Sequence, residues 1–275
     1  MLELTGDFAS RHRIGLHTHL LEAKTQHLMA PPEHGGSFVR YLDQFGLVNP
    51  RSSLAHFVWC SPEDVELAAE RGVNVVHNPV SNLILGSGIQ PLARLLRAGL
   101  NVALGTDGQS GGAVSILEQA KFASLLSRVA NTDPRHWVDP RAAFRLATEG
   151  GARVMGLSGE AGLIEPGARA DIALIDTTGA GWRLRGNVYS HLVMYESGAN
   201  VRSVIVEGEL VVREGRCTRV NEAELLEEAQ AIAAEQSGAN AGSLALAEQD
   251  APHVMKLLLE ALARPAAPNR FAELR

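Results

Sequence analysis

Four polar signatures occur in a fixed order along this chain, and each one closes a short apolar run. They are His17-Thr18-His19-Leu20-Leu21-Glu22, Ala55-His56, His77-Asn78-Pro79-Val80-Ser81-Asn82 and Gly105-Thr106-Asp107-Gly108. Ionisable side chains at the ends of successive strands, with helices between the strands, are how a parallel α/β barrel assembles a metal site. The pattern therefore predicts an α/β fold with a polar site at one end of a parallel sheet.

The segments around these signatures alternate between strand and helix. Strands are predicted at residues 53–55, 73–76 and 100–104, and an apolar run at 14–16 leads into His17. Helices are predicted at 36–46, from Ser61 to a stop at Gly72, and over 91–98, 113–129 and 140–155. The helix after Ser61 has a capping hydroxyl and a proline at its first position. Near-continuous apolar strands between helices indicate a parallel sheet that is covered on both faces.

From Gly162 onward the predicted secondary structure changes from alternating strands and helices to short consecutive strands. Short strands are predicted at 171–175, 201–206 and 210–213, with Glu207-Gly208 as a hairpin turn. A helix is predicted at 222–235, a linker at 237–243 and a terminal amphipathic helix at 254–263. The chain is therefore expected to comprise a hydrolase-type α/β part at 1–160, a small β-rich part at 161–220 and a helical tail at 221–275.

Composition limits the partners of the chain. With 275 residues, of which 45% are hydrophobic, it is long enough to bury a sizeable core. A net charge of −6 argues against nucleic acid or an anionic membrane as the main partner. Cys60 and Cys217 are far apart and not in a metal-like spacing, which predicts free thiols in a reducing cytoplasm. Neither a signal peptide nor an apolar run of ~20 residues is expected.

The signatures contain groups that suit metal-assisted catalysis. His17 and His19 lie two residues apart and so project to one side of a strand, which favours a metal site. Glu22 has the chemistry of a general base, with an ordinary helix-start acid as the alternative. Asp107 directly follows an apolar strand, which favours a ligand or catalytic carboxylate over a simple Asp-Gly turn. For His56 the sequence leaves two interpretations open: a buried histidine that only forms hydrogen bonds, or an active-site residue.

Taken together, the four signatures resemble those of the amidohydrolase superfamily. The similarity is to its cytosine deaminase-like branch, which includes S-adenosylhomocysteine/methylthioadenosine deaminases and chlorotriazine-type hydrolases. The segments Gly162–Asp171 and Val204–Gly208 also resemble that family's return into a small β-sandwich. The resemblance runs from about Leu4 to about Glu222 and implies an enzyme.

The resemblance implies a role for each main site residue. His19 would be the metal-binding histidine after strand five, and Glu22 the proton shuttle. His56 would help to polarise substrate or water, and Asp107 would be both metal ligand and general base. The implied reaction is metal-assisted hydrolysis, with zinc or iron, at an amidine-like ring carbon of a small molecule, and an amine or ammonia leaves.

Other residues are expected to line the substrate pocket. By the same resemblance His77 and Asn82 would lie near the pocket and contact substrate, while a turn stabilised by Asn and Ser side chains is the alternative for this segment. The segment Gln109-Ser110-Gly111-Gly112, beside Asp107, is a further hint of a tailored pocket.

One expected feature of the family is not found. Its first barrel strand carries a His-x-His pair that supplies two metal ligands. His19 and Asp107 are 88 positions apart. A (β/α)₈ barrel uses about 31 residues per unit, so this distance fits three units, from strand five to strand eight. The expected fold is therefore the C-terminal half of a TIM-type barrel, strands five to eight, followed by a small β-sandwich portion and C-terminal helices.

A half-barrel has consequences for activity and assembly. Its two sheet edges are unpaired, which predicts a homo-oligomer or a missing N-terminal half supplied by another chain. Catalytic zinc usually has three or more protein ligands. A catalytically inactive fragment or interaction subunit is therefore the alternative to an active hydrolase, and a metal-free α/β binding protein is a third hypothesis.

Overall fold

The computed structural model describes residues 1–108, 114–183 and 186–265, and the segment Gln109–Gly112 lies outside the described residues. The chain divides into two compact units. The first comprises Met1–Arg169 and Thr177–Ala199, and the second comprises Ala170–Asp176 and Asn200–Pro265. Among the described residues, none of the helices combines the length and the apolarity that crossing a membrane requires.

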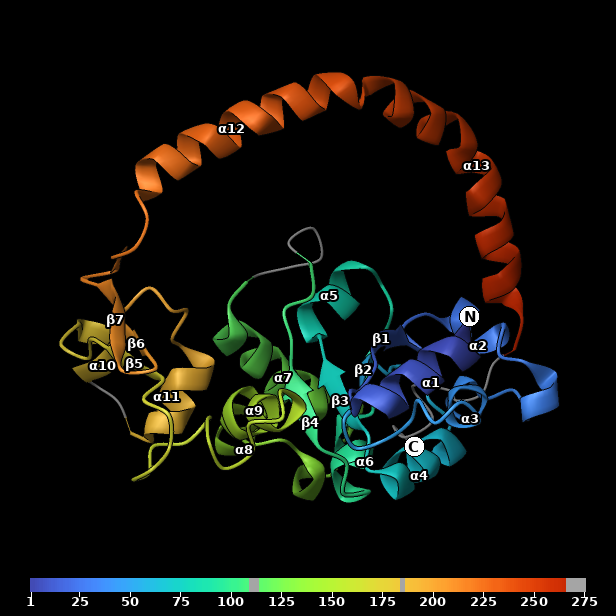
Figure 1. Ribbon diagram of the computed structural model, residues 1–275, viewed down its shortest axis with the longest axis horizontal. Coiled ribbons are helices and arrows are strands. Elements are labelled where there is room, and N and C mark those ends of the chain that lie inside the picture. The colour runs from blue at the N-terminus through green and yellow to red at the C-terminus, as the bar shows by residue number, and fades with distance from the viewer. Residues whose placement is uncertain (109–113, 184–185, 266–275) are drawn as a thin grey trace. The chain divides into compact units, whose positions relative to one another are not determined.

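A four-stranded parallel sheet forms the centre of the first unit (Figure 1). Its strands are β1 (His17–Leu20), β2 (Ser53–His56), β3 (Asn74–His77) and β4 (Val102–Leu104), in that spatial order. All neighbouring pairs are parallel, with His19 opposite Ala55. Every residue of β2 and β4 is buried, as the near-continuous apolar runs predict. The α/β prediction is confirmed to this extent.

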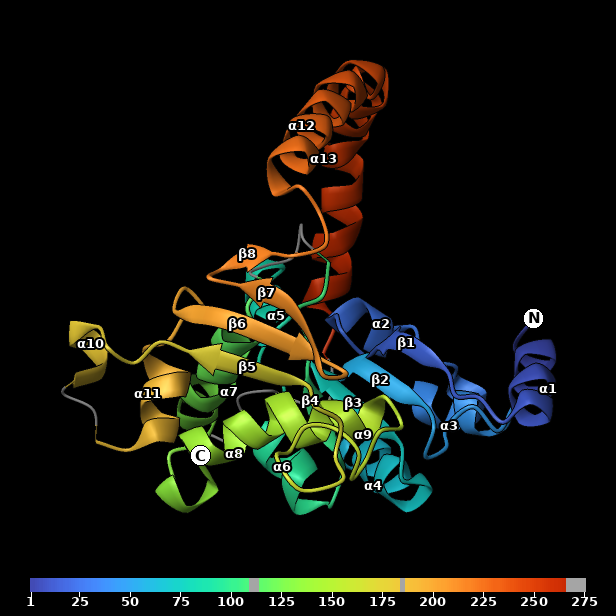
Figure 2. The same ribbon diagram turned by 60° about the vertical axis from the view of Figure 1, so that its left-hand side comes forward.

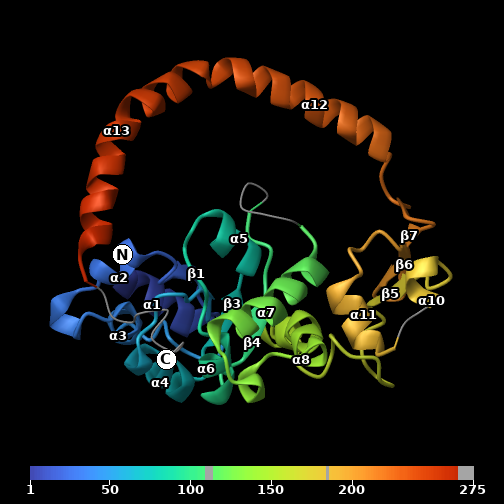
Figure 3. The ribbon, with the colours of Figure 1, turned by 180° about the vertical axis from the view of Figure 1, so that it is seen from behind.

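Helices of the first unit precede, connect or follow these strands in the sequence (Figures 1 and 3). They are α1 (Leu2–His12), α2 (Lys24–Leu28), η1 (Pro32–His34), α3 (Phe38–Asp43), α4 (Pro62–Arg71), α5 (Pro79–Ile84), α6 (Leu92–Arg97), α7 (Ile116–Ala130), η3 (Pro134–His136), α8 (Pro140–Arg145), the π-helical turn η4 (Leu146–Gly150), α9 (Gly151–Val154), α10 (Ala180–Arg183) and α11 (Val188–Met194). The start of α4 is the predicted one, since Ser61 and Asp64 form a complete capping box.

The main core lies between the parallel sheet and its helices. Leu54 and Val75 of the sheet are fully buried, and so are Val39 of α3 and Leu95 of α6. Gly15 packs so closely on the turn before β2 that a Cβ would lie 1.8 Å from the carbonyl oxygen of Arg51. This dense packing fixes the strand ends, from which the polar signatures project.

The second unit contains an antiparallel sheet (Figure 2). Its strands are β5 (Ile172–Ile175), β6 (Val201–Val206), β7 (Glu209–Arg213) and β8 (Arg216–Cys217), in sequential order. The predicted hairpin turn is confirmed, because Glu207 and Gly208 join β6 to β7 with φ of 50° and 83°. Cys60 and Cys217 are not joined by a disulfide.

Two long helices, α12 (Glu222–Ala239) and α13 (Ala241–Ala263), follow this sheet. The predicted linker at 237–243 is wrong, since only Asn240 separates the two helices. Gly238 and Gly242 lie among alanine, leucine and glutamate, and these strong helix formers outweigh two glycines. Neither helix contains a buried residue.

Candidate active site

Three potential metal ligands meet at the carboxyl ends of the parallel strands. His19 lies in β1, His56 is the last residue of β2, and Asp107 lies three residues after β4. One ligand atom from each side chain lies within 4.8 Å of those of the other two. The parallel sheet explains this meeting, because the carboxyl ends of its strands share one edge.

The separations suit a shared cation better than direct hydrogen bonds. Nε2 of His19 is 3.9 Å from Oδ1 of Asp107, and Nε2 of His56 is 3.7 Å from Oδ2 of the same carboxylate. Zinc binds histidine nitrogen and carboxylate oxygen at about 2.0–2.2 Å, so two of its ligand atoms lie at most about 4.4 Å apart. Both histidine-to-aspartate separations are within that limit.

His56 is the most tightly constrained of the three ligand candidates. Its side chain is fully buried, and Nδ1 lies 2.8 Å from Oδ1 of Asn82. The side-chain amide of Gln90 donates to the backbone carbonyl of His56. Nε2 is buried and has no hydrogen-bond partner among the described residues. A buried imidazole nitrogen without a partner, facing two carboxylates, fits a metal-binding atom.

The backbone at two of these positions is left-handed. His56 has a φ of 70° and Asp107 a φ of 62°. Non-glycine residues adopt this region uncommonly, although histidine and aspartate tolerate it better than most. Such strain is found most often at functional sites, where the surrounding structure holds it in place.

Hydrogen bonds hold the carboxylate of Asp107. The hydroxyl of Ser81 donates to Oδ2 at 2.6 Å, and the backbone N–H of Gly108 donates to Oδ1 at 2.8 Å. Burial is the largest single influence on the pKa of Asp107 and acts to raise it, while these two hydrogen bonds act to lower it. The nearby His56 and His19 lower the pKa further, so the net shift is downward and the carboxylate stays ionised.

Glu22 completes the cluster from the loop after β1. Its Oε2 lies 3.8 Å from Nε2 of His56, and the hydroxyl of Ser87 donates to its Oε1 at 3.5 Å. Trp59 in turn donates from its indole nitrogen to the backbone carbonyl of Ser87 at 2.8 Å. The side chain of Glu22 is 25% exposed, so its carboxylate both contacts the buried histidine and reaches solvent.

The remaining histidines of the signatures lie outside the ligand cluster. Nδ1 of His17 hydrogen-bonds to the hydroxyl of Ser53 at 2.7 Å. His77 is buried, and burial, together with nearby His56, lowers its pKa to about 3. His77 is therefore neutral at ordinary pH. Among the described residues, the ligand cluster includes neither of them.

Sequence reasoning did not assign roles to Ser81, Ser87 and Gln90. Ser81 lies inside the third signature, so its place in the motif was a signal that its chemistry mattered. Ser87 and Gln90 lie in a glycine-containing loop, where spacing and composition do not distinguish them. Their contacts become visible only when the loop is folded against β2.

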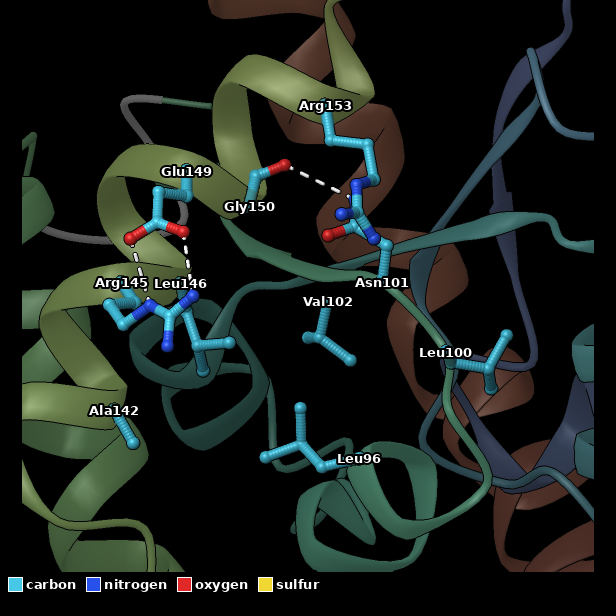
Figure 4. A pocket seen from close by; sticks show the side chains of 10 residues that line it. All are labelled: Leu96, Leu100, Asn101, Val102, Ala142, Arg145, Leu146, Glu149, Gly150 and Arg153. Carbon is cyan, nitrogen blue, oxygen red and sulfur yellow. Dashed lines mark hydrogen bonds and ion pairs between the residues drawn. The ribbon is translucent and has the colours of Figure 1, made fainter. Parts of the chain in front are cut away.

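A cavity of about 250 Å³ lies elsewhere in the first unit, at the start of β4 (Figure 4). Leu96, Val102 and Leu146 contribute apolar side chains to its wall. Its charged pair is already satisfied, since Nε of Arg145 donates to Oε1 of Glu149 at 2.8 Å. The predicted site residues do not line this cavity, so the strand ends remain the candidate site.

Comparison with known proteins links this geometry to a family. The amidohydrolase family model matches residues 1–211. A 5'-deoxyadenosine deaminase from Methanothermobacter thermautotrophicus is 39% identical over 242 residues, which cover 86% of this chain and 55% of the relative. A 5-methylthioadenosine/S-adenosylhomocysteine deaminase from Thermococcus onnurineus is 40% identical over 205 residues, covering 74% and 48%. The chain thus spans about half the length of the curated relatives it matches.

Solved structures give the same picture. An adenosine deaminase from Xanthomonas campestris with bound zinc matches with a TM-score of 0.79 and 30% identity, covering 83% of this chain and 52% of that one. An atrazine chlorohydrolase from Arthrobacter aurescens, complexed with zinc, matches with a TM-score of 0.77 and 28% identity, covering 84% and 51%. The two kinds of enzyme in the sequence-based resemblance, adenosine-type deaminases and chlorotriazine hydrolases, are thus both among the matches.

Proposed function

Because this chain belongs to the amidohydrolase family, we propose that it carries active-site residues of a metal-dependent aminohydrolase. The reaction is hydrolysis of a carbon–nitrogen bond that is not a peptide bond, with release of ammonia or an amine from a small aminated heterocycle. One observation carries the proposal: His19, His56 and Asp107 bring three ligand atoms together beside the carboxylate of Glu22.

The ligand set suits zinc, and the same residues suit iron. His19, His56 and Asp107 would hold the metal, since imidazole and carboxylate are ligands of both ions. When bound, the metal supplies a Lewis acid that activates water and polarises the substrate. The buried Nε2 of His56, which has no hydrogen-bond partner among the described residues, supports this assignment.

The protein residues divide the proton transfers between them. Glu22 reaches both solvent and the interior of the site, so its carboxylate suits the transfer of a proton from water to the leaving nitrogen. Asp107 stays ionised because hydrogen bonds from Ser81 and Gly108 stabilise its charge, and it accepts a proton at Oδ2 or Oδ1. Nε2 of His56, the atom that would bind the metal, lies between the two carboxylates, 3.8 Å from Glu22 and 3.7 Å from Asp107.

The first substrates to test are adenine nucleosides. The relatives are named as deaminases of 5'-deoxyadenosine and of 5-methylthioadenosine or S-adenosylhomocysteine. An amino group on the adenine ring fits the proposed chemistry, because its carbon is amidine-like. The side chains of His77 and Asn82 are both buried. That these two residues contact substrate stays a prediction.

The parallel sheet has a natural place in the family's barrel. We infer that β1–β4 correspond to strands five to eight of a (β/α)₈ barrel. Coverage of about half of each relative supports this, as does the position of His19 and Asp107 on the first and last of these strands. Further ligands would then come from strands one to four of such a barrel. The boundaries at 160 and 220 likewise stay predictions.

Metal content of the purified chain, measured with its native mass, tests the proposal first. About one zinc or iron per chain is the expected result. It would be followed by an ammonia-release assay on 5'-deoxyadenosine and S-adenosylhomocysteine, with and without the N-terminal half of a relative. A chain that binds no metal and stays inactive after this addition would favour the alternative, a catalytically inactive fragment or interaction subunit.

A further inference from the structure

The short helix α5 carries two adjacent residues that hold two different groups of the site. Ser81 donates to Oδ2 of Asp107 at 2.6 Å, and Asn82 pairs with Nδ1 of His56 at 2.8 Å. Building on the proposed function, we propose that Ser81 and Asn82 are positioning residues, which orient His56 and Asp107 toward one shared point. Neither would have to touch substrate for this role.

The contact of Asn82 determines which nitrogen of His56 is available. The Oδ1 atom of an asparagine only accepts hydrogen bonds, so Nδ1 of His56 must carry the proton. In the neutral ring the lone pair is then on Nε2, the atom that faces Glu22 and Asp107. Metal-binding histidines commonly use their second nitrogen in this way, because the outer hydrogen bond fixes both the tautomer and the ring plane.

Burial makes this contact the main restraint on the ring. His56 and Asn82 are 0% and 1% exposed, so water does not compete for the hydrogen bond. An apolar side chain in place of Asn82 would leave Nδ1 with no acceptor in a dry environment. The ring would then gain by moving its proton to Nε2, next to the two carboxylates, and Nε2 would lose its free lone pair.

Ser81 acts on the other partner. Its hydroxyl holds Oδ2 of Asp107, the oxygen that lies 3.7 Å from Nε2 of His56. The backbone N–H of Gly108 holds Oδ1, the oxygen that faces His19. With both oxygens held, the carboxylate plane cannot rotate away from the two histidines.

The helix that carries the pair is itself anchored. Its first turn contains Pro79, which suits a helix start, directly after the end of β3. The backbone N–H of Val80 donates to the side-chain oxygen of Gln119, a buried residue of α7. Adjacent helical residues point about 100° apart, so one anchored turn can reach Asp107 and His56 at once.

Nitrogen-resolved NMR of histidine rings in the full chain tests the tautomer directly. In its neutral form, the His56 ring is expected to carry its proton on Nδ1. Asn82→Leu should abolish this tautomer, while Asn82→Asp, which keeps an acceptor oxygen, should retain it. A bare Nδ1 in the wild-type protein would overturn the proposal, whether or not any variant folds.

Zinc affinity, measured by competition with a coloured chelator, gives a second readout. Asn82→Leu and Ser81→Ala should each weaken zinc binding about 10- to 100-fold, and Asn82→Asp should stay within a few-fold of wild type. The matched control is Asn74→Leu, a buried asparagine whose amide donates to Pro50 and Ser52 carbonyls at 2.9 and 3.0 Å. It should lower stability but leave zinc affinity unchanged.

The two hypotheses fail in different ways. Folded Asn82→Leu protein with wild-type zinc affinity and an unchanged His56 tautomer would overturn the positioning role alone. Wild-type protein that binds no zinc would count against the proposed function, while the NMR measurement would still decide the role of Asn82. Equal losses in Asn82→Asp and Asn82→Leu would also overturn the positioning role, because the acceptor oxygen would then be irrelevant.

Discussion

Glu22 is the residue whose replacement best separates chemistry from metal binding. Glu22→Gln keeps the shape of the side chain but removes its ability to carry a proton. We expect metal content to stay at the wild-type level and the deamination rate to fall by about 10²- to 10⁴-fold in the active assembly. Glu33→Gln, an exposed glutamate in η1, is the matched control and should leave the rate unchanged. Full activity in Glu22→Gln would refute the proton-transfer role.

Asp107 should matter for metal binding itself. Asp107→Asn removes the negative charge that faces both histidines, so zinc affinity should fall by at least about 10-fold. Chelator competition measures the change. The control variant is Asp43→Asn, which removes a carboxylate that pairs with Arg71 and is not in the ligand cluster. It should retain wild-type zinc affinity. Equal affinities for the two variants would contradict the ligand assignment.

His77 should make the stability of the chain depend on pH. Its pKa is about 3 in the folded protein, against an ordinary value of 6.5, because burial and nearby His56 disfavour the charged form. Its contribution to stability is complete above pH 6.5 and is lost as the pH falls toward 3. The loss should approach about 1.4 kcal/mol per pH unit.

Urea unfolding of the metal-free chain at a series of pH values measures this dependence. His77→Gln cannot titrate, so its unfolding free energy should fall less steeply than that of wild type over the same range. Parallel curves for the two proteins would show that His77 is not responsible. A metal-free sample is needed because metal binding is itself pH-dependent and would add its own slope to the curve.

At the scale of elements, the contact between η4 and β4 is unusually close. A Cβ on Gly150 would lie 2.5 Å from the carbonyl oxygen of Val102, whereas a Cβ on Gly151 would have no neighbour within 4 Å. Gly150→Ala should therefore lower the unfolding free energy by roughly 1–3 kcal/mol. Gly151→Ala should raise it by roughly 0.5–1 kcal/mol, since alanine favours the helix. Equal effects in urea unfolding would refute the close packing.

The predicted elements were most accurate where local signals agree. Apolar runs ending in a polar residue identified β2, β3 and β4, and a capping hydroxyl followed by proline identified α4. The helix predicted at 140–155 is instead interrupted by the π-helical turn η4, because Gly150 must approach the backbone of β4. Helix α1 was not predicted, since Gly6 interrupts its helical sequence pattern. A glycine is needed there because a Cβ would lie 2.2 Å from the carbonyl oxygen of Phe45.

The site was predicted in part for the same reason. Strand ends bring His19, His56 and Asp107 together, and this follows from order along the chain. The pairing of Asn82 with His56 depends on how α5 turns back over the sheet, and it joins residues 26 positions apart. Left-handed backbone at His56 and Asp107 has no local sequence signal either, because neither position is a glycine.

At the scale of the whole molecule, α12 and α13 contribute no buried residue to a hydrophobic core. Ending the chain after Ala223 should change the unfolding free energy of the remaining protein by no more than about 0.5 kcal/mol. Ending it after Val220 should cost more, because the carboxylate of Glu222 accepts from the backbone N–H of Cys217 at 2.9 Å. Urea unfolding of both truncated chains checks this. A large loss after the first truncation would contradict it.

The first unit is discontinuous in sequence, and this has a consequence for synthesis on the ribosome. The chain leaves that unit to form β5 and returns to it for residues 177–199 before β6 begins at Val201. At about 5–20 residues per second, β5 emerges roughly one to five seconds before β6, the strand with which it pairs. During that interval its backbone edge is unpaired, and α11 of the first unit emerges only shortly before β6. The nascent chain therefore passes through a stage at which an edge strand is open to the wrong partner, and a ribosome pausing before Val201 would prolong it.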